Sequence, residues 1–120
     1  MANILIVDDS RTSRKMLRDI LERRGHVIIG EAVDGQEAFD QYVKLKPDLV
    51  TMDITMPVMD GIEALKLIRK NDPNAKVIMI TAAGQKEKML EAIKTGALEF
   101  ITKPFNDDVV LEIVDNITNS

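Results

Sequence analysis

Residues 3–9, NILIVDD, combine a short run of apolar, β-forming side chains with two consecutive aspartates. Residues 49–53, LVTMD, repeat this pattern and end on Asp53. Short apolar runs of this kind are typical of strands buried on both faces of a parallel sheet. Open α/β sheets form their sites at the carboxyl ends of the strands. Both stretches therefore predict that Asp8, Asp9 and Asp53 meet at one edge of such a sheet.

Three carboxylates at one sheet edge need a cation. Two such charges about 4 Å apart repel by roughly 4 kcal/mol at an effective dielectric constant near 20. A hard divalent ion such as Mg²⁺ is the natural candidate, because it binds a few carboxylates, keeps several waters and leaves positions for phosphate oxygens. The acidic cluster therefore predicts a magnesium site.

Composition narrows the class of protein. A chain of 120 residues with 45% hydrophobic content can bury one core, so we expect a single domain over residues 1–120. The net charge of −4 and the absence of a long basic run argue against a nucleic-acid-binding module. The chain has no cysteine, which excludes disulfides and thiol catalysis. We see no signal peptide and no apolar stretch of membrane-spanning length, so we expect a cytoplasmic protein without membrane partners.

Apolar runs alternate five times with amphipathic helical patterns along the chain. This alternation predicts an α/β fold, a doubly wound (βα)5 parallel sheet. The expected strands cover about residues 3–7, 27–32, 49–52, 76–80 and 99–102. The first expected helix ends at Gly25, and the second runs from 34–35 to 46. The third runs from 60–61 to before 72, the fourth covers about 86–95, and the fifth begins after a cap at Asn106. Helical spacing predicts these buried side chains: Met16, Leu17, Ile20, Leu21, Ala38, Phe39, Tyr42, Val43, Ile62, Leu65, Ile68, Met89, Ala92, Ile93, Val110, Ile113, Val114 and Ile117.

Several separated motifs follow the predicted strands in register. They are Asp8-Asp9, Asp53 with Met56-Pro57 and Asp60-Gly61, Thr81-Ala82, and Lys103-Pro104-Phe105. Together they resemble the response-regulator receiver family over nearly the whole chain. Residues 51–57 and the Gly84-Gln85 pair make the chain most similar to the stand-alone chemotaxis regulators of that family. The resemblance implies the flavodoxin-like strand order 2-1-3-4-5, in which the first and third strands are neighbours.

The resemblance also implies roles for the acidic residues. Asp53 would be the nucleophile that accepts a phosphoryl group from a partner's phosphohistidine and becomes an acyl phosphate. Asp9, Asp53 and the backbone carbonyl of Thr55 would hold Mg²⁺ directly, and Asp8 would reach it through water. The chain would assist its own phosphorylation and dephosphorylation and would not otherwise be an enzyme.

Four further residues receive roles from the resemblance. Lys103 would supply a positive charge to a phosphoryl oxygen, and the Thr81 hydroxyl would donate a hydrogen bond to another. The peptide bond before Pro104 would be cis. Thr81 would be coupled to Phe100, the switch aromatic that moves inward on phosphorylation.

The expected partners are proteins. A histidine kinase would donate the phosphoryl group, and a phosphatase is a further candidate. The output would be docking of another protein, such as a component of the flagellar motor switch, on the face formed by the fourth helix, the fifth strand and the fifth helix. We therefore expect a single-domain response regulator of a two-component system, acting in chemotaxis.

Other functions stay open. Phe100 lacks a hydroxyl and residues 10–15 are more polar than in many chemotaxis members, which leaves a phosphorelay carrier as the alternative. A flavodoxin-like electron carrier would share the fold, but Asp8-Asp9 would repel a flavin phosphate. A phosphohydrolase of the haloacid-dehalogenase type needs a second aspartate two positions after the first, where this chain has Thr55.

Three motifs have simpler interpretations. Asp8-Asp9 would also serve as a capping pair for the first helix, a role compatible with metal binding. Asp60-Gly61 is interpreted as a helix start and nothing more. His26 lies between a helix end and a strand, so it is interpreted as a structural residue and not as a phosphohistidine.

Overall fold

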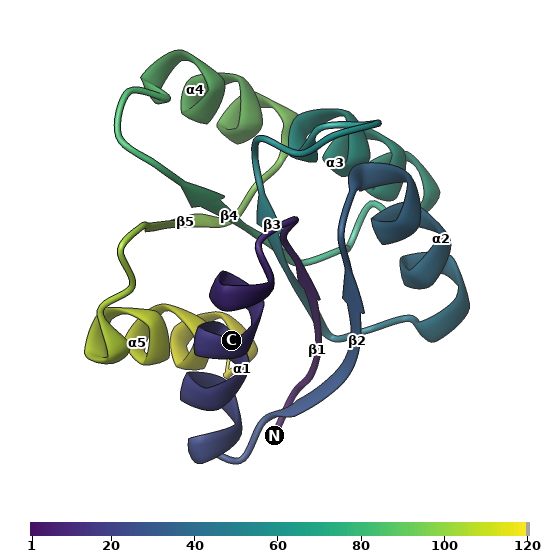
Figure 1. The fold of residues 1–120 in the computed structure, drawn as a ribbon. Coiled ribbons are helices and arrows are strands. Elements are labelled where there is room, and N and C mark those ends of the chain that lie inside the picture. Colours follow the sequence, from purple (N-terminus) through teal and green to yellow (C-terminus); the bar gives the residue numbers. More distant parts are fainter. Residues whose placement is uncertain (120) are drawn as a thin grey trace.

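The computed structural model describes residues 1–119 as five strands alternating with five helices (Figure 1). The strands are β1 (Asn3–Val7), β2 (Val27–Ala32), β3 (Leu49–Asp53), β4 (Val77–Thr81) and β5 (Glu99–Thr102). The helices are α1 (Arg11–Arg23), α2 (Gly35–Leu45), α3 (Gly61–Asn71), α4 (Lys86–Thr95) and α5 (Asp107–Thr118). All neighbouring strands pair in parallel in the order β2-β1-β3-β4-β5, which confirms the predicted doubly wound sheet.

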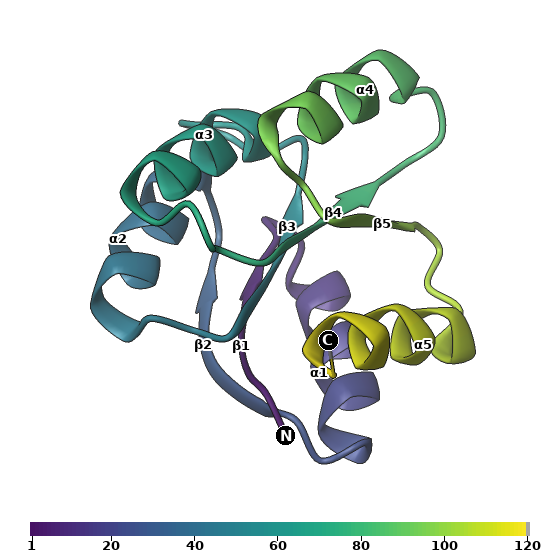
Figure 2. The same ribbon diagram turned by 180° about the vertical axis from the view of Figure 1, so that it is seen from behind.

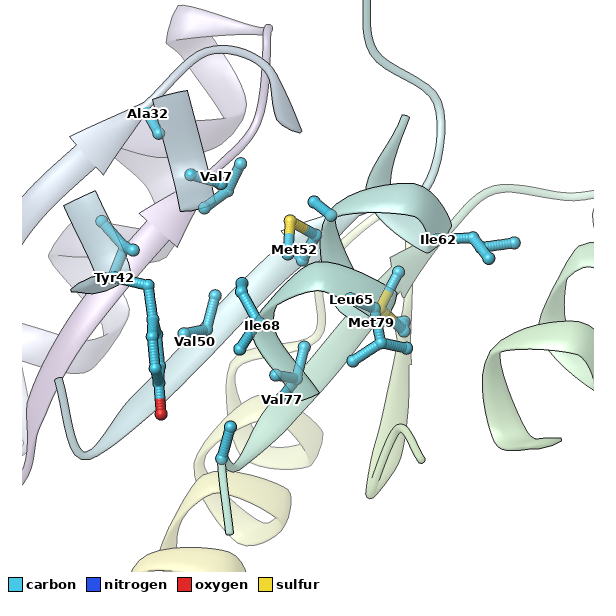
Figure 3. Packing of buried hydrophobic residues seen from close by; sticks show 14 of the residues in the cluster. Val7, Ala32, Tyr42, Val50, Met52, Ile62, Leu65, Ile68, Val77 and Met79 are labelled. Atoms are coloured by element: carbon cyan, nitrogen blue, oxygen red, sulfur yellow. The ribbon is translucent and has the colours of Figure 1, made fainter. Parts of the chain in front are cut away.

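The helices cover the sheet on both faces (Figure 2). The side of α1 and α5 contains an apolar cluster of residues such as Leu17, Ile20, Val110 and Val114. The side of α2, α3 and α4 contains a second cluster, in which side chains of α2 and α3 pack on those of β3 and β4 (Figure 3). Every residue of β3 and β4 is buried, as expected for central strands covered on both faces.

Three predicted core residues are wrong. Met16, Val43 and Ile93 are 46%, 42% and 52% exposed. A helix that lies flat on a sheet buries a narrow stripe, so apolar residues at the border of the stripe stay in water. For α4 the stripe shrinks to Ala92, because this helix lies over the β4-β5 side of the sheet (Figure 1).

Four helices begin at a residue whose side chain caps them, and three of these starts, at Asp34, Asp60 and Asn106, agree with the predicted helix starts. Ser10, Asp34, Asp60 and Asn106 each accept a hydrogen bond from the backbone N–H three residues further on. Strand β4 lies one residue later than predicted, so Thr81 ends the strand and does not follow it. No helix within residues 1–119 is both long and apolar enough to cross a membrane.

Candidate functional site

The three aspartates gather at the carboxyl edge of β1 and β3. These strands pair in parallel with Val7 opposite Met52, so the residues that follow lie side by side. One carboxylate oxygen from each of Asp8, Asp9 and Asp53 lies within 4.8 Å of the other two. Asp8 and Asp53 are buried, whereas Asp9 is exposed. Within residues 1–119, this is the one group of three or more acidic, histidine or cysteine side chains that could hold a metal ion.

Lys103 brings a cation to this cluster from the other side of β4. Its Nζ lies 2.9 Å from Oδ2 of Asp8 and 3.3 Å from Oδ2 of Asp53. Its backbone N–H donates a hydrogen bond to the Thr81 carbonyl at 2.8 Å, and the peptide bond to Pro104 is cis. The lysine therefore joins the ends of β1, β3 and β4 at one point.

Asp8 is held on several sides. Its Oδ1 accepts a hydrogen bond from the Ser10 N–H at 2.8 Å, and its carbonyl oxygen accepts one from Arg14 Nη1 at 2.7 Å. Arg14 is fixed in turn by an ion pair of 2.9 Å between its Nε and Oε1 of Glu31. The capping interpretation of Asp8-Asp9 is wrong, because Ser10 caps α1 with its own hydroxyl.

The backbone beside Asp53 packs closely against the start of α3. The Gly61 N–H donates to the Ile54 carbonyl at 2.8 Å, and a Cβ atom at position 61 would lie 2.1 Å from the Asp53 carbonyl oxygen. Only glycine allows this approach. The interpretation of Asp60-Gly61 as a helix start is therefore confirmed, and Gly61 in addition lets α3 begin against the phosphoacceptor candidate.

The electrostatics of the cluster depend on burial. Burial and the neighbouring charge of Asp8 raise the pKa of Asp53 to about 6, although Lys103 acts in the opposite direction. Burial alone would lower the pKa of Lys103, but its hydrogen bond with Asp8 and the charge of Asp53 outweigh that effect and raise it. An oxygen-only donor set with more negative charge than one lysine offsets fits a hard divalent ion such as Mg²⁺.

Thr81 and Phe100 lie on neighbouring strands. The pairing of Met79 with Phe100 and of Thr81 with Thr102 puts Thr81 and Phe100 on the same face of the sheet, one pleat apart. Thr81 is buried and Phe100 is partly buried against the cluster under α2, α3 and α4. The structure thus brings the two switch candidates near each other on adjoining strands.

Two other residues differ in their surroundings. Thr55 is exposed, and its hydroxyl oxygen accepts a hydrogen bond from Gln85 Nε2 at 2.7 Å. Gln85 was not predicted as a neighbour of the site, and its only signal in the sequence was the motif with Gly84. His26 is buried, and its Nδ1 accepts a hydrogen bond from the Ala2 N–H at 3.2 Å. It directly precedes β2 and therefore lies at the opposite edge of the sheet from the aspartates.

Comparison with known proteins gives one consistent family. The family described as Response regulator receiver domain matches residues 4–115. The Chemotaxis protein CheY of Thermotoga maritima is 51% identical over 115 residues, which are 96% of each chain. Protein CcdB of Bacillus subtilis is 53% identical over 117 residues, which are 98% of each chain. A chain in the crystal structure of the CheX-CheY-BeF3-Mg+2 complex from Borrelia burgdorferi superposes with a TM-score of 0.91 at 44% identity, covering 96% of this chain and 87% of that chain.

Proposed function

This chain belongs to the response regulator receiver domain family, and on that premise we propose that it is a phosphoacceptor switch of a two-component system. Asp53 accepts a phosphoryl group from the phosphohistidine of a histidine kinase. The observation that carries the proposal is the cluster of three carboxylates within 4.8 Å of one another, two of them contacted by Lys103. We also propose that residues 1–120 form one receiver domain.

The chemistry follows from the charge state of Asp53. One carboxylate oxygen attacks the phosphorus atom, the bond from phosphorus to the donor nitrogen breaks, and an acyl phosphate forms. The carboxylate must be deprotonated for this attack, and a pKa of about 6 leaves it mostly deprotonated at neutral pH. Lys103 keeps its positive charge within reach of Asp53 and offers hydrogen bonds to phosphoryl oxygens.

A magnesium ion fits the residues at this edge. Asp9, Asp53 and the Thr55 carbonyl would hold it directly, and Asp8 would hold it through water. When bound, Mg²⁺ neutralises negative charge on the phosphoryl oxygens. Asp8 contributes a carboxylate whose position is fixed by Ser10 and by the contact of Arg14 with its carbonyl.

The output is protein docking on the α4-β5-α5 face. Phosphorylation moves the side chains of Thr81 and Phe100. Because Phe100 belongs to β5, the central element of that face, its movement carries the change from the site to the docking face. Four apolar side chains with about half of their surface in water lie on or beside α4, β5 and α5: Leu90, Ile93, Leu98 and Val109. Exposed apolar side chains on these elements suit contact with a partner protein.

Chemotaxis is the pathway that we favour, with a component of the flagellar motor switch as the output partner. Support comes from the CheY of Thermotoga maritima, which is 51% identical to this chain. The complex of CheX with CheY is a precedent for protein docking by a similar chain. A phosphorelay carrier is the second candidate, because Phe100 has no hydroxyl with which to hydrogen-bond a docked partner.

Intact-mass spectrometry tests the phosphoacceptor. The protein is incubated with acetyl phosphate in the presence of Mg²⁺ or of EDTA, alongside Asp53→Asn and the surface control Asp40→Asn. We expect the gain of one hydroxylamine-labile phosphoryl group in the wild type and the control, no gain in Asp53→Asn, and no gain in EDTA. A phosphoryl group that persists in Asp53→Asn would contradict the assignment.

A further inference from the structure

Gln85 joins two loops at the carboxyl edge of the sheet. Its Nε2 donates a hydrogen bond to Oγ1 of Thr55, and its Oε1 accepts one from the Ala82 N–H, both at 2.7 Å. Thr55 lies two residues after Asp53, and Ala82 directly follows Thr81. A single side-chain amide therefore bridges the loop that leaves β3 and the loop that leaves β4.

The side chain of Gln85 makes this bridge instead of capping helix α4. Gln85 is the N-cap residue of α4, yet its side chain makes no capping hydrogen bond with the helix. The other four helices each have such a contact, which stabilises the start of a helix. The amide of Gln85 is directed back to the loops beside the aspartates instead of to its own helix.

The bridge acts next to a backbone anchor of the loop after β3. The Ile54 N–H donates to the Ile80 carbonyl at 3.2 Å, and the Ile54 carbonyl accepts a hydrogen bond from the Gly61 N–H at 2.8 Å. Thr55, the next residue, is exposed, and its hydroxyl oxygen accepts a hydrogen bond from Gln85. Gln85 thus adds a side-chain contact that holds Thr55 beside this anchor.

We infer that Gln85 is a positioning residue for the metal site, an inference that rests on the proposed function. The other proposed metal ligands are the aspartates at the ends of β1 and β3, whereas the Thr55 carbonyl lies in the loop after β3. A ligand that is already fixed costs less ordering when the ion binds. By tying Thr55 to the loop after β4, Gln85 therefore increases the affinity of the unphosphorylated protein for Mg²⁺.

The test measures Mg²⁺ binding by isothermal titration calorimetry on the full, unphosphorylated chain. Gln85→Ala and Thr55→Val each remove the contact between the two side chains. We expect each to raise the Kd for Mg²⁺ by about threefold to tenfold, the size expected for one or two lost hydrogen bonds. Because both changes break the same bridge, the double variant should bind no more weakly than the weaker single variant.

A matched control separates the bridge from general effects. Gln36→Ala removes the same side chain from an exposed contact with Asp40 on α2 and should bind Mg²⁺ like the wild type. Hydrogen exchange at the Ala82 amide should be faster in Gln85→Ala, which frees that N–H, and less affected in Thr55→Val, which leaves its acceptor in place.

The phosphorylation rate with acetyl phosphate gives an independent readout. In Gln85→Ala, the Mg²⁺ concentration for half-maximal rate should rise with the Kd, whereas the rate at saturating Mg²⁺ should stay within about twofold of the wild type. The inference is overturned if Gln85→Ala binds Mg²⁺ like the wild type, or if the effects of the two single changes multiply in the double variant. If the wild type itself neither binds Mg²⁺ nor is phosphorylated, the proposed function fails instead.

Discussion

The Nζ atom of Lys103 lies 3.3 Å from Oδ2 of Asp53, although Asp53 ends β3, Lys103 follows β5, and β4 lies between these two strands. Each residue influences the charge of the other. Burial and the charge of Asp8 raise the pKa of Asp53 to about 6, and Lys103 opposes that rise. The protonation state of the candidate nucleophile therefore depends on a side chain from the end of β5.

Removing this cation should raise the pKa of Asp53 further. In the metal-free protein, we expect Lys103→Met to move the titration of the Asp53 carboxyl upward by about one unit or more, the size typical of a lost opposite charge within 4–6 Å. Carbon-detected NMR titration of the aspartate carboxyl groups measures this directly. Lys66→Met, which removes an exposed lysine paired with Glu91, should leave the titration unchanged. An unchanged midpoint in Lys103→Met would contradict the electrostatic account.

The raised pKa also predicts how stability depends on pH. The pKa of Asp53 is raised from 3.8 to about 6 in the folded protein, so between these values the folded state binds more protons than the unfolded state. Without metal, this carboxyl therefore makes the free energy of unfolding fall as pH rises through that window, by roughly 2–3 kcal/mol in total. At pH values above this range the charged, buried carboxylate lowers the free energy of unfolding by the full amount, and at pH values below it the carboxyl is neutral and costs no stability.

Asp53→Asn should remove that penalty. In EDTA, we expect the variant to be more stable than the wild type at pH values above about 6 and to lose this advantage by about pH 4. Urea unfolding at the two pH values provides the measurement. An equal advantage at both values would mean that the amide packs better, and that the charge is not the cause.

The sequence pattern predicted the strand-end residues of the site well. In a parallel sheet all carboxyl ends lie at one edge, so residues at the ends of the neighbouring strands β1 and β3 have to lie close together. Asp8, directly after β1, and Asp53, the last residue of β3, are such residues. Lys103 follows β5, two strands away from Asp53, and only the resemblance to a family indicated that its long side chain reaches back across β4.

Features that depend on side-chain packing were not predictable in this way. The bridge from Gln85 to Thr55 requires two loops of particular shape, and no periodicity encodes loop shape. The close approach of Gly61 to the Asp53 carbonyl depends on how α3 lies against β3. Helical spacing also overestimated the buried stripe at Ile93, because its width depends on where α4 lies over the sheet.

Thr51 is a buried residue of β3 whose hydroxyl oxygen has no hydrogen-bond partner. An unsatisfied buried hydroxyl costs about 1–3 kcal/mol. Thr51→Val replaces the hydroxyl by a methyl group of similar shape, so we expect it to increase the free energy of unfolding by about 1 kcal/mol in urea. Thr51→Ser keeps the hydroxyl and loses the methyl group, so it should destabilise the protein. A destabilised Thr51→Val would show that the hydroxyl is satisfied in solution.

Val58 adopts a strained backbone in the loop between β3 and α3. Its φ is 67°, and the Met59 N–H donates to the Pro57 carbonyl at 2.7 Å, which makes Val58 the centre of a three-residue turn. A β-branched residue rarely adopts positive φ, and the strain costs about 1–3 kcal/mol. The side chain is 85% exposed, so packing offsets little of this cost.

Val58→Asn should therefore stabilise the protein by about 1 kcal/mol in urea unfolding, because asparagine tolerates positive φ far better than valine. Val33→Asn is the matched control: Val33 is also an exposed loop valine, 39% exposed, and it is not among the described residues with positive φ. The control should not gain stability. Equal gains in both variants would mean that the benefit comes from replacing an exposed apolar side chain, and the strain at Val58 would then be relieved in solution.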